Sequence, residues 1–326
     1  MKIALLNCYF GHLPVYFRLW LQSCEKNPTV DFFLFTDDTV PDRVPPNVSV
    51  VQSSFEEMIN RIQSKFDFRV AITSPYKLTD FKPAYGFIFE DLFKPYDYWG
   101  YCDMDLVFGN IMKYIQQPME QGIEKIYRLG HLTVYKNSEK MRQLFRQKGA
   151  KFSYKEVFSN PEFYSFDEHA GMISIAKRQG ISQYCREDMA DISCRIKRMT
   201  ASRHENYPYQ VFYSEDGAVY RSYLKNGAVE SEEYIYIHFQ KRGFSSIEKS
   251  ERFFLLSDRI QEKQPGIPGI EEIKALSEYV DDGIDRSQLL SFKRRKMKVF
   301  FSCSLKEKSI WIKNKLAEIN LKNCKK

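Results

Sequence analysis

The chain has 326 residues, enough to bury the core of one large α/β domain, and its 26 Phe and 21 Tyr exclude a generally disordered protein. Its seven scattered cysteines form no Cys-x-x-Cys pair, which excludes a disulfide framework or a zinc site of that kind and indicates reduced cytosolic thiols. The formal charge of +7 is uneven, because residues 291–326 carry twelve Lys or Arg against two Glu, a net of +10, and leave −3 for the rest.

The N-terminal apolar stretch is too short for a signal peptide, and no run of about eighteen uncharged apolar residues predicts a transmembrane helix. We predict a strand at residues 2–8, a helix over 14–26 and a second strand at 31–36. In such a βαβ unit the strands are parallel, and ligands bind beyond their carboxyl ends. No glycine-rich dinucleotide or P-loop motif follows the first strand. The strand ends instead carry three candidate nucleotide-binding residues: Asn7, Tyr9 and Asp37.

Two elements and a motif follow: a strand at 47–51, a helix over 55–65 and the segment Lys77-Leu-Thr-Asp-Phe-Lys-Pro83. Asp80 is suited to the N-cap, and Pro83 to the first turn, of a helix that continues to about residue 93. Lys77 and Lys82 lie near that helix start, where they either contact a phosphate or lie on an ordinary exposed face. We count both lysines, with Asp80, as candidate nucleotide-binding residues.

The segment Tyr98-Trp-Gly-Tyr-Cys-Asp-Met-Asp-Leu-Val-Phe-Gly109 is the most informative part of the sequence. Residues i and i+2 of a strand face the same way, so Asp103 and Asp105 can present oxygens to one point. Mg²⁺ and Mn²⁺ bind such carboxylates, commonly together with substrate phosphates. A solvated turn after a strand is the alternative, but the surrounding Trp, Tyr, Phe and Leu are unusual for a turn. We therefore expect a divalent cation with a nucleoside diphosphate.

The next elements are predicted to be a helix over 111–117, a strand at 126–135 and a helix over 138–148. A bend at Leu129-Gly-His131 would let a sugar approach the backbone. The segment Phe166-Asp-Glu-His-Ala-Gly171 opens another helix, and acidic residues are favoured at helix N-termini. Capping alone would explain Asp167, and a catalytic role is the alternative.

From residue 209 to 240 the pattern changes to antiparallel strands. Glu215-Asp-Gly217 and Lys225-Asn-Gly227 mark two hairpin turns. The last strand, 234–239, leads into Gln240-Lys-Arg-Gly243, and a helix is expected over 270–280.

Three segments of the chain resemble metal-dependent glycosyltransferases of the GT-A type, and in particular a group from bacterial capsule and O-antigen biosynthesis. They are Lys77-Leu-Thr-Asp-Phe-Lys-Pro83, Trp99-Gly-Tyr-Cys-Asp-Met-Asp105 and His238-Phe-Gln-Lys-Arg242. The resemblance extends to about residue 245, and the order and spacing of the three segments make it more specific than any one of them.

The resemblance implies a role for several residues. Asp103 would lie near the ribose and the metal, Asp105 would ligate the metal, and His238 would complete the metal or diphosphate site. Imidazole is a reasonable ligand for Mn²⁺ and a poorer one for Mg²⁺. Lys241 and Arg242 would neutralise the departing diphosphate.

The resemblance also gives Asp167 and Glu168 the place of an acceptor-side carboxylate. In an inverting enzyme one of them would be the general base. Many relatives carry Glu-Asp and this chain carries Asp-Glu, which leaves open which carboxylate acts and whether the reaction inverts.

We therefore expect an α/β fold of GT-A type, with a mostly parallel sheet and antiparallel C-terminal hairpins. The domains would be a catalytic domain at 1–245, an extension packed on it at 246–290 and a basic tail at 291–326. The function would be transfer of a sugar from a nucleoside diphosphate, with UDP expected, to a glycan or lipid-linked glycan during bacterial surface polysaccharide synthesis. The sugar, the acceptor, the linkage and the oligomeric state are not encoded in any recognisable pattern.

The tail places apolar residues at three-, four- and seven-residue intervals among its lysines, with Trp311 close by. Such a basic amphipathic helix is suited to an anionic lipid surface, so we expect a cytoplasmic enzyme on the inner face of the plasma membrane. Packing of the stripe onto the catalytic domain is the alternative. The apolar positions are Met297, Phe301, Leu305, Ile312, Leu316 and Ile319.

Two other function classes fit part of the sequence. Asp103-Met-Asp-Leu-Val107 matches the nucleophile motif of haloacid-dehalogenase-like phosphatases, with Asp281-Asp282 as a late acidic pair. That motif usually closes the first strand of its domain, whereas a full βαβ unit precedes it here. A non-enzymatic protein that binds membranes or nucleic acid through its tail is the second class, but no recognition motif accompanies the charge. We expect no nucleic-acid partner.

Overall fold

The structure, a computed structural model, describes residues 1–277 except residues 42, 195 and 241. These residues lie within one compact unit. The basic tail predicted at 291–326 and the acidic pair Asp281-Asp282 fall outside the described residues.

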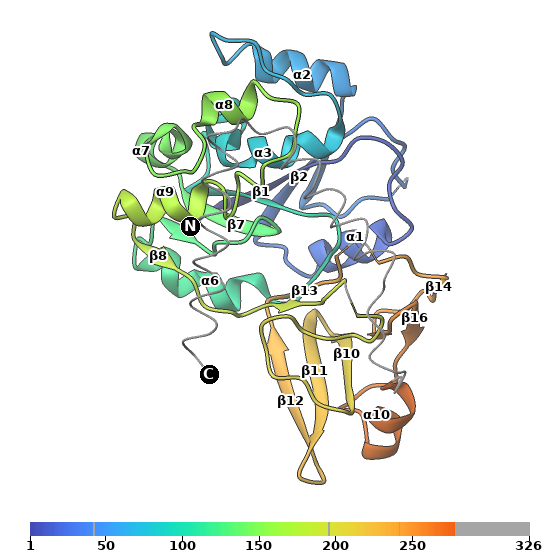
Figure 1. The fold of residues 1–326 in the computed structure, drawn as a ribbon. Coiled ribbons are helices and arrows are strands. Elements are labelled where there is room, and N and C mark those ends of the chain that lie inside the picture. The colour runs from blue at the N-terminus through green and yellow to red at the C-terminus, as the bar shows by residue number, and fades with distance from the viewer. Residues whose placement is uncertain (42, 195, 241, 278–326) are drawn as a thin grey trace. The chain divides into compact units, whose positions relative to one another are not determined.

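A mixed sheet forms the centre of this unit (Figure 1). It has seven strands in the order β3-β2-β1-β4-β7-β6-β8. The first four strands in that order are parallel, β7 is antiparallel to β4 and β6, and β8 is parallel to β6. The expected α/β class with a mostly parallel sheet is confirmed. The strands are β1 Ile3–Cys8, β2 Val30–Thr36, β3 Val48–Gln52, β4 Tyr98–Cys102, β6 Lys125–Ile126, β7 Leu132–Lys136 and β8 Gln183–Tyr184.

Helices cover both faces of this sheet, because its strands alternate apolar residues between two cores (Figure 1). On one face Ile3 and Leu5 pack with α1 and α6, and on the other Ala4 and Leu6 pack with the remaining helices. The helices are α1 Phe17–Glu25 and α6 Ile111–Glu120 on the first face, and α2 Phe55–Gln63, α3 Leu78–Phe81, α4 Tyr85–Ile88, α5 Glu90–Phe93, α7 Glu139–Arg142, α8 Tyr154–Phe158 and α9 Met172–Arg178 on the second.

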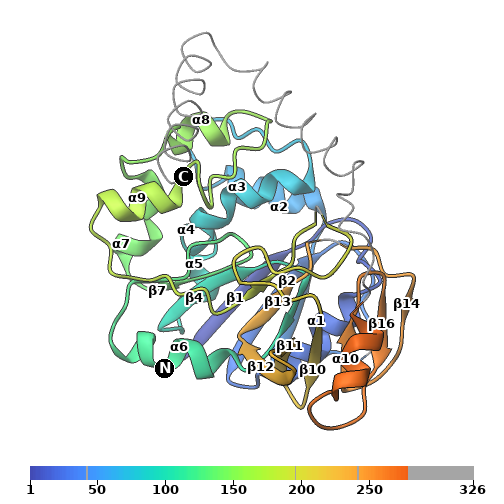
Figure 2. The same cartoon turned by 60° about the horizontal axis from the view of Figure 1, so that its bottom comes forward.

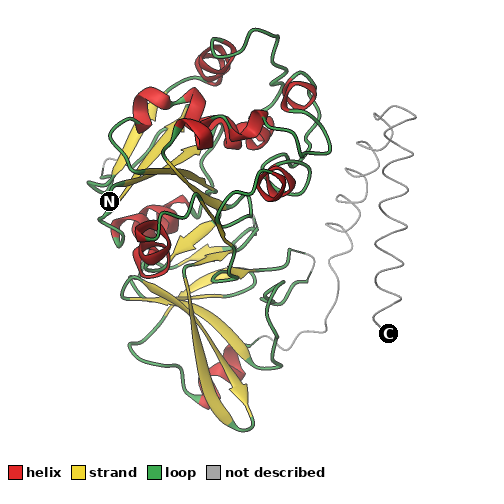
Figure 3. Ribbon diagram, turned by 90° about the vertical axis from the view of Figure 1, so that its left-hand side faces the viewer, coloured by secondary structure: helices red, strands yellow, loops and turns green. Residues whose placement is uncertain are grey.

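A second, six-stranded sheet shares the α1 core and contacts α10 (Figures 2 and 3). Both predicted hairpin turns are present, with Asp216 and Gly217 at φ 50° and 82°, and Asn226 and Gly227 at φ 52° and 81°. Positive φ at both central residues is the geometry that suits two-residue hairpins. The elements are β10 Gln210–Glu215, β11 Ala218–Lys225, β12 Ala228–Tyr234, β14 Ser246–Ile247, β15 Phe253–Leu255, β16 Arg259–Glu262 and α10 Ile270–Leu276.

A third sheet of three short strands, β5 Leu106–Phe108, β13 Tyr236–His238 and β9 Ala190–Asp191, links the other two. β13 is central, antiparallel to β5 and parallel to β9. This small sheet joins three distant parts of the chain, and it determines where the candidate site lies.

Several expected elements are shorter than predicted. The single helix expected from Asp80 to residue 93 is instead the end of α3, the 3₁₀ turn Lys82–Ala84, α4 and α5, and a further 3₁₀ turn, Pro75–Lys77, precedes α3. Pro83 cannot donate a helical hydrogen bond, and Phe89, between α4 and α5, has the non-helical angles φ −111° and ψ 34°. The expected 126–135 strand is interrupted between β6 and β7, and the expected 138–148 helix is only α7 followed by the 3₁₀ turn Leu144–Arg146.

Candidate active site

The acidic motif lies where β4 ends and the chain enters β5. The backbone N–H of Asp103 donates to the carbonyl of His131 at 2.9 Å, which holds the first carboxylate beside the start of β7. Asp105 directly precedes β5, where Leu106 is paired with His238 of β13. The N–H of Phe239 donates to the carbonyl of Asp105 at 3.2 Å and closes this pairing.

The structure brings Asp103, Asp105 and His238 together, although they are far apart in the sequence. One ligand atom from each lies within 4.8 Å of the others, and His238 Nε2 is 3.5 Å from Asp105 Oδ2. Asp105 is 3 % exposed, whereas the Asp103 side chain is 30 % exposed. Two carboxylates and an imidazole are a suitable donor set for Mn²⁺, and Asp103 is the more exposed of the two carboxylates. These residues fit the expected divalent cation.

Three residues to which the sequence analysis gave no role at His238 surround it: Asp191, His131 and Gln240. Asp191 accepts a hydrogen bond from His238 Nδ1 at 2.9 Å and another from Gln240 Nε2 at 2.8 Å. His131 stacks on the His238 ring with centroids 4.4 Å apart. Gln240 was visible in the His-Phe-Gln-Lys-Arg segment, but no local pattern distinguishes Asp191.

The charges of this cluster depend on one another. Burial opposes protonation of His238, but the Asp105 and Asp191 carboxylates outweigh it and raise its pKa to about 10. Burial likewise opposes ionisation of Asp191, and His238 reverses this to lower the Asp191 pKa to about 2. Burial and then the neighbouring His238 charge lower the pKa of His131 well below its usual value. Without a cation, His238 is therefore the positive partner of these carboxylates, and a bound cation would take over that charge.

The sequence predicted either a phosphate contact or an exposed face for Lys82. In the structure its ammonium lies beside the acidic motif and contacts carboxylates. Its ammonium donates to Asp103 Oδ1 and to the carbonyl of Gly130, and it lies 3.9 Å from Asp167 Oδ2. Burial disfavours its charge, but Asp103 and Asp167 outweigh burial and raise the Lys82 pKa. Lys82 therefore joins Asp103 to Asp167 as an internal counter-ion.

The segment 166–171 leads into the predicted helix, α9, but this helix begins only at Met172, so Asp167 and Glu168 do not cap it and its first turn holds no acidic residue. The carboxylates have other partners than a helix N-terminus. Glu168 Oε1 accepts the N–H of Gly130 at 2.6 Å, and a Cβ on Gly130 would lie 2.1 Å from Asp167 Oδ2. The Asp167 carboxylate therefore occupies the space beside Gly130 in which a sugar was expected to approach the backbone. Burial, only partly offset by Lys82, raises the Asp167 pKa well above its usual range.

Lys77 and Asp80 do not belong to the cluster. Both are fully buried and form an ion pair at 2.8 Å, and Asp80 lies inside α3, so the N-cap prediction is wrong. Lys77 also donates to the carbonyls of Val157 and Glu162, which leaves its ammonium enclosed by protein acceptors. A buried lysine with three such acceptors cannot also meet a phosphate. The pair instead anchors the chain that leads to Asp167.

Arg242 is also enclosed by protein. Its guanidinium donates to the backbone carbonyls of Ser193, Ile196 and Lys197 and so holds that loop. The expected contact between Arg242 and a diphosphate is therefore not supported by this geometry. Lys241 is outside the described residues.

The three strand-end candidates take different positions. Asn7 is 5 % exposed, and its Nδ2 has no acceptor among the described residues. Tyr9 is half-buried, and burial, with the nearby Asp105 charge, raises its pKa. Asp37 is exposed and accepts the N–H of Gly11 at 2.7 Å. Only Tyr9 among them is placed beside the acidic motif by these contacts.

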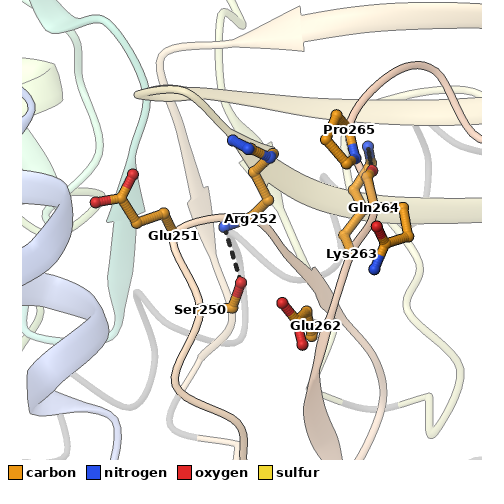
Figure 4. A pocket seen from close by; sticks show the side chains of 7 residues that line it. All are labelled: Ser250, Glu251, Arg252, Glu262, Lys263, Gln264 and Pro265. Carbon is orange, nitrogen blue, oxygen red and sulfur yellow. Dashed lines mark hydrogen bonds between the residues drawn. The ribbon is translucent and has the colours of Figure 1, made fainter.

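A separate hollow is formed by Ser250, Glu251, Arg252, Glu262, Lys263, Gln264 and Pro265 on the C-terminal strands (Figure 4). It shares no residue with the cluster. Its Lys263 is 3 % exposed and already donates to Glu215 and to the carbonyls of Gln264 and Gly266, so the hollow lacks an available buried cation.

Residues 5–264 match a family of unknown function (DUF6625). The chain belongs to this family. No curated protein matches the sequence. Among solved structures, the chain is similar to the galactosyltransferase LgtC in complex with donor and acceptor sugar analogs, with 8% identity, 59% of this chain and 75% of that one covered, and a TM-score of 0.30. It is also similar to the glycosyltransferase GlyE in Streptococcus pneumoniae TIGR4, with 12% identity, coverages of 57% and 45%, and a TM-score of 0.31.

Within the described part of the chain, no helix has both the length and the apolar character needed to cross a bilayer.

Proposed function

We propose that this protein is a metal-dependent glycosyltransferase that moves a sugar from a nucleoside diphosphate, with UDP expected, to a glycan acceptor. The observation that carries the proposal is the convergence of Asp103, Asp105 and His238 on one point at the end of β4. The resemblance of the three sequence segments to GT-A enzymes supports it, because two of these segments supply all three side chains.

Asp105 and His238 would hold the cation from the buried side, and Asp103 would share it with the donor. A bound Mn²⁺ or Mg²⁺ would offset the negative charge on the departing diphosphate. Lys82 keeps the surrounding carboxylates partly neutralised, so that they do not repel that diphosphate.

For the acceptor we propose Glu168 as the general base of an inverting reaction. Asp167 is 5 % exposed and lies against Lys82 and Gly130, whereas Glu168 is only partly buried. A base must come within hydrogen-bond reach of the acceptor hydroxyl, which favours the more accessible carboxylate. Asp167 would then position Lys82.

The wider role is proposed from the sequence. A lipid-linked glycan of a bacterial surface polysaccharide is the expected acceptor, and the basic tail at 291–326 would hold the enzyme at the anionic inner face of the plasma membrane.

The test is to incubate the full-length protein with nucleotide-sugars and measure nucleotide release with Mn²⁺, with Mg²⁺ and after EDTA. Release should require a cation, Asp105→Asn should abolish it, and His238→Ala should weaken it and raise the metal requirement. Asp258→Asn, an exposed change of the same kind, is the matched control. Undiminished turnover in EDTA would contradict the proposal, and trapping of an aspartyl-phosphate would favour the phosphatase alternative.

A further inference from the structure

We propose that Asp191 is a positioning residue for the metal ligand His238, and that it fixes which imidazole nitrogen faces the cation. This inference rests on the proposed metal site and extends it to a carboxylate outside the three resembling segments. The chemical class of the bound group is a divalent cation with oxygen and imidazole ligands.

The two nitrogens of His238 face two different carboxylates. Nδ1 is 2.9 Å from Asp191 Oδ1, and Nε2 is 3.5 Å from Asp105 Oδ2. A neutral imidazole has one N–H and one lone pair, so donation of Nδ1–H to Asp191 leaves the Nε2 lone pair on the side of Asp105. Carboxylates that accept the second N–H of a metal-bound histidine orient the ring and raise its basicity in this way.

Asp191 is itself rigidly held. It is paired with His238 in the β9–β13 register, and the N–H of Ile192 donates to the His238 carbonyl at 2.8 Å. The N–H of Ser202 donates to the Asp191 carbonyl at 2.7 Å. Gln240 Nε2 donates to the same carboxylate oxygen as His238 and fixes its direction. The carboxylate therefore lies in a framework that leaves little freedom to the His238 ring.

His131 restricts the ring from its other side. It is 5 % exposed, stacks on His238 with an angle of 25° between the rings, and its Nδ1 is 2.6 Å from the Tyr236 hydroxyl. His131, Asp191 and His238 could also form a cation site by proximity. Asp191 Oδ1 already accepts two donors and His131 Nδ1 is engaged by Tyr236, so such a site would have to use Asp191 Oδ2 and His131 Nε2, and the Asp105→Asn variant distinguishes the two sites.

The experiment is titration of the metal-free full-length protein with Mn²⁺, followed by calorimetry and by the EPR signal of free Mn²⁺, without donor or acceptor. Asp105→Asn should abolish binding, and Asp191→Asn should weaken it about 10–100-fold. Asp188→Asn is the control, because it removes an equally buried charge three residues away whose carboxylate accepts the Tyr127 and Tyr184 hydroxyls. Its Mn²⁺ affinity should equal that of the wild type.

Two further variants separate positioning from folding. Asp191→Glu keeps the charge and should recover much of the affinity lost in Asp191→Asn, which a general loss of structure would not predict. Gln240→Met keeps the length of the side chain and removes only the donor that holds Asp191. It should weaken Mn²⁺ binding in the same direction by a smaller factor, and it decides the question if Asp191→Asn fails to fold.

Wild-type affinity in folded Asp191→Asn, or in Gln240→Met where that variant is decisive, would overturn the inference. So would loss of binding in Asp191→Asn together with retained binding in Asp105→Asn, because Asp191 would then be a direct ligand. If the Mn²⁺ affinities follow this pattern but the protein transfers no sugar, the proposed function is contradicted. The role of Asp191 at the cation site would still hold.

Discussion

The buried pair Lys77–Asp80 should be one of the most important stabilising contacts outside the apolar core. The side chains are 1% and 0% exposed, and the ammonium has three acceptors: Asp80, the Val157 carbonyl and the Glu162 carbonyl. The Asp80 carboxylate in turn accepts the N–H groups of Tyr164 and Phe166. Asp80→Asn would leave an uncompensated ammonium in a site closed to water.

Removing one partner of a buried ion pair typically costs about 3–5 kcal/mol, and we expect Asp80→Asn to fall in this range. Lys77→Met should also be strongly destabilising, because it leaves the carboxylate buried. The double variant carries no charge, and the amide oxygen introduced at position 80 can still accept the two backbone N–H groups. Its cost should therefore be less than the sum of the single costs by about 2–3 kcal/mol.

Urea unfolding followed by tryptophan fluorescence measures these values, since Trp20 and Trp99 are fully buried. Glu271→Gln, which breaks an exposed pair with Lys274, should leave the unfolding free energy unchanged. A cost below about 1 kcal/mol for Asp80→Asn, or strict additivity in the cycle, would refute this account of the pair.

Three further predictions concern the acceptor base, a second buried lysine and the tail. Glu168→Gln should lower kcat about 10²–10⁴-fold with donor binding retained, and if Asp167→Asn is the variant that does this in steady-state kinetics, the roles are reversed. Burial lowers the Lys125 pKa to about 8 from 10.5, so its charge destabilises the fold below pH 8 and this penalty disappears as the pH rises to 10.5. Lys125→Met should therefore raise the unfolding free energy at pH 7 by up to about 3 kcal/mol and converge with the wild type near pH 10.5, whereas equal stability at pH 7 would exclude the penalty. In the full chain, the three tail lysines Lys306, Lys313 and Lys315 can be changed to Glu. At about 1 kcal/mol for each lost basic residue, the affinity for anionic liposomes, measured by sedimentation, should fall at least about 100-fold. Unchanged sedimentation would argue for another anchor.

The parts of the fold that depend on local chemistry could be predicted from the sequence. The opening βαβ unit follows from apolar runs separated by an amphipathic helix, and the Asn226-Gly227 hairpin follows from two residues that tolerate positive φ. The long helix expected after Asp80 is wrong because Pro83 cannot donate a helical hydrogen bond and Phe89 leaves the helical conformation.

The candidate site was predictable only in part, for a physical reason. Asp103 and Asp105 are two residues apart in the short connection between β4 and β5, so the same few residues hold both carboxylates and their spacing is visible in the sequence. Asp191 contacts His238 only because β9 pairs with β13, and no short-range pattern encodes that pairing. Lys77 was misassigned because a lysine usually reaches solvent, and its burial depends on acceptors from the distant chain at 157–162.

The three-stranded sheet β5-β13-β9 also affects how late in folding the candidate metal site is completed. Its strands come from three widely separated parts of the chain, so its contacts are of high sequence separation and should form late in folding. During synthesis the acidic motif would leave the ribosome well before the residues of β13, and a chain interrupted before residue 236 would carry both aspartates without the imidazole. Cation binding would then draw the last strands into place, so that hydrogen exchange at His238 and Ile192 should slow when Mn²⁺ is added.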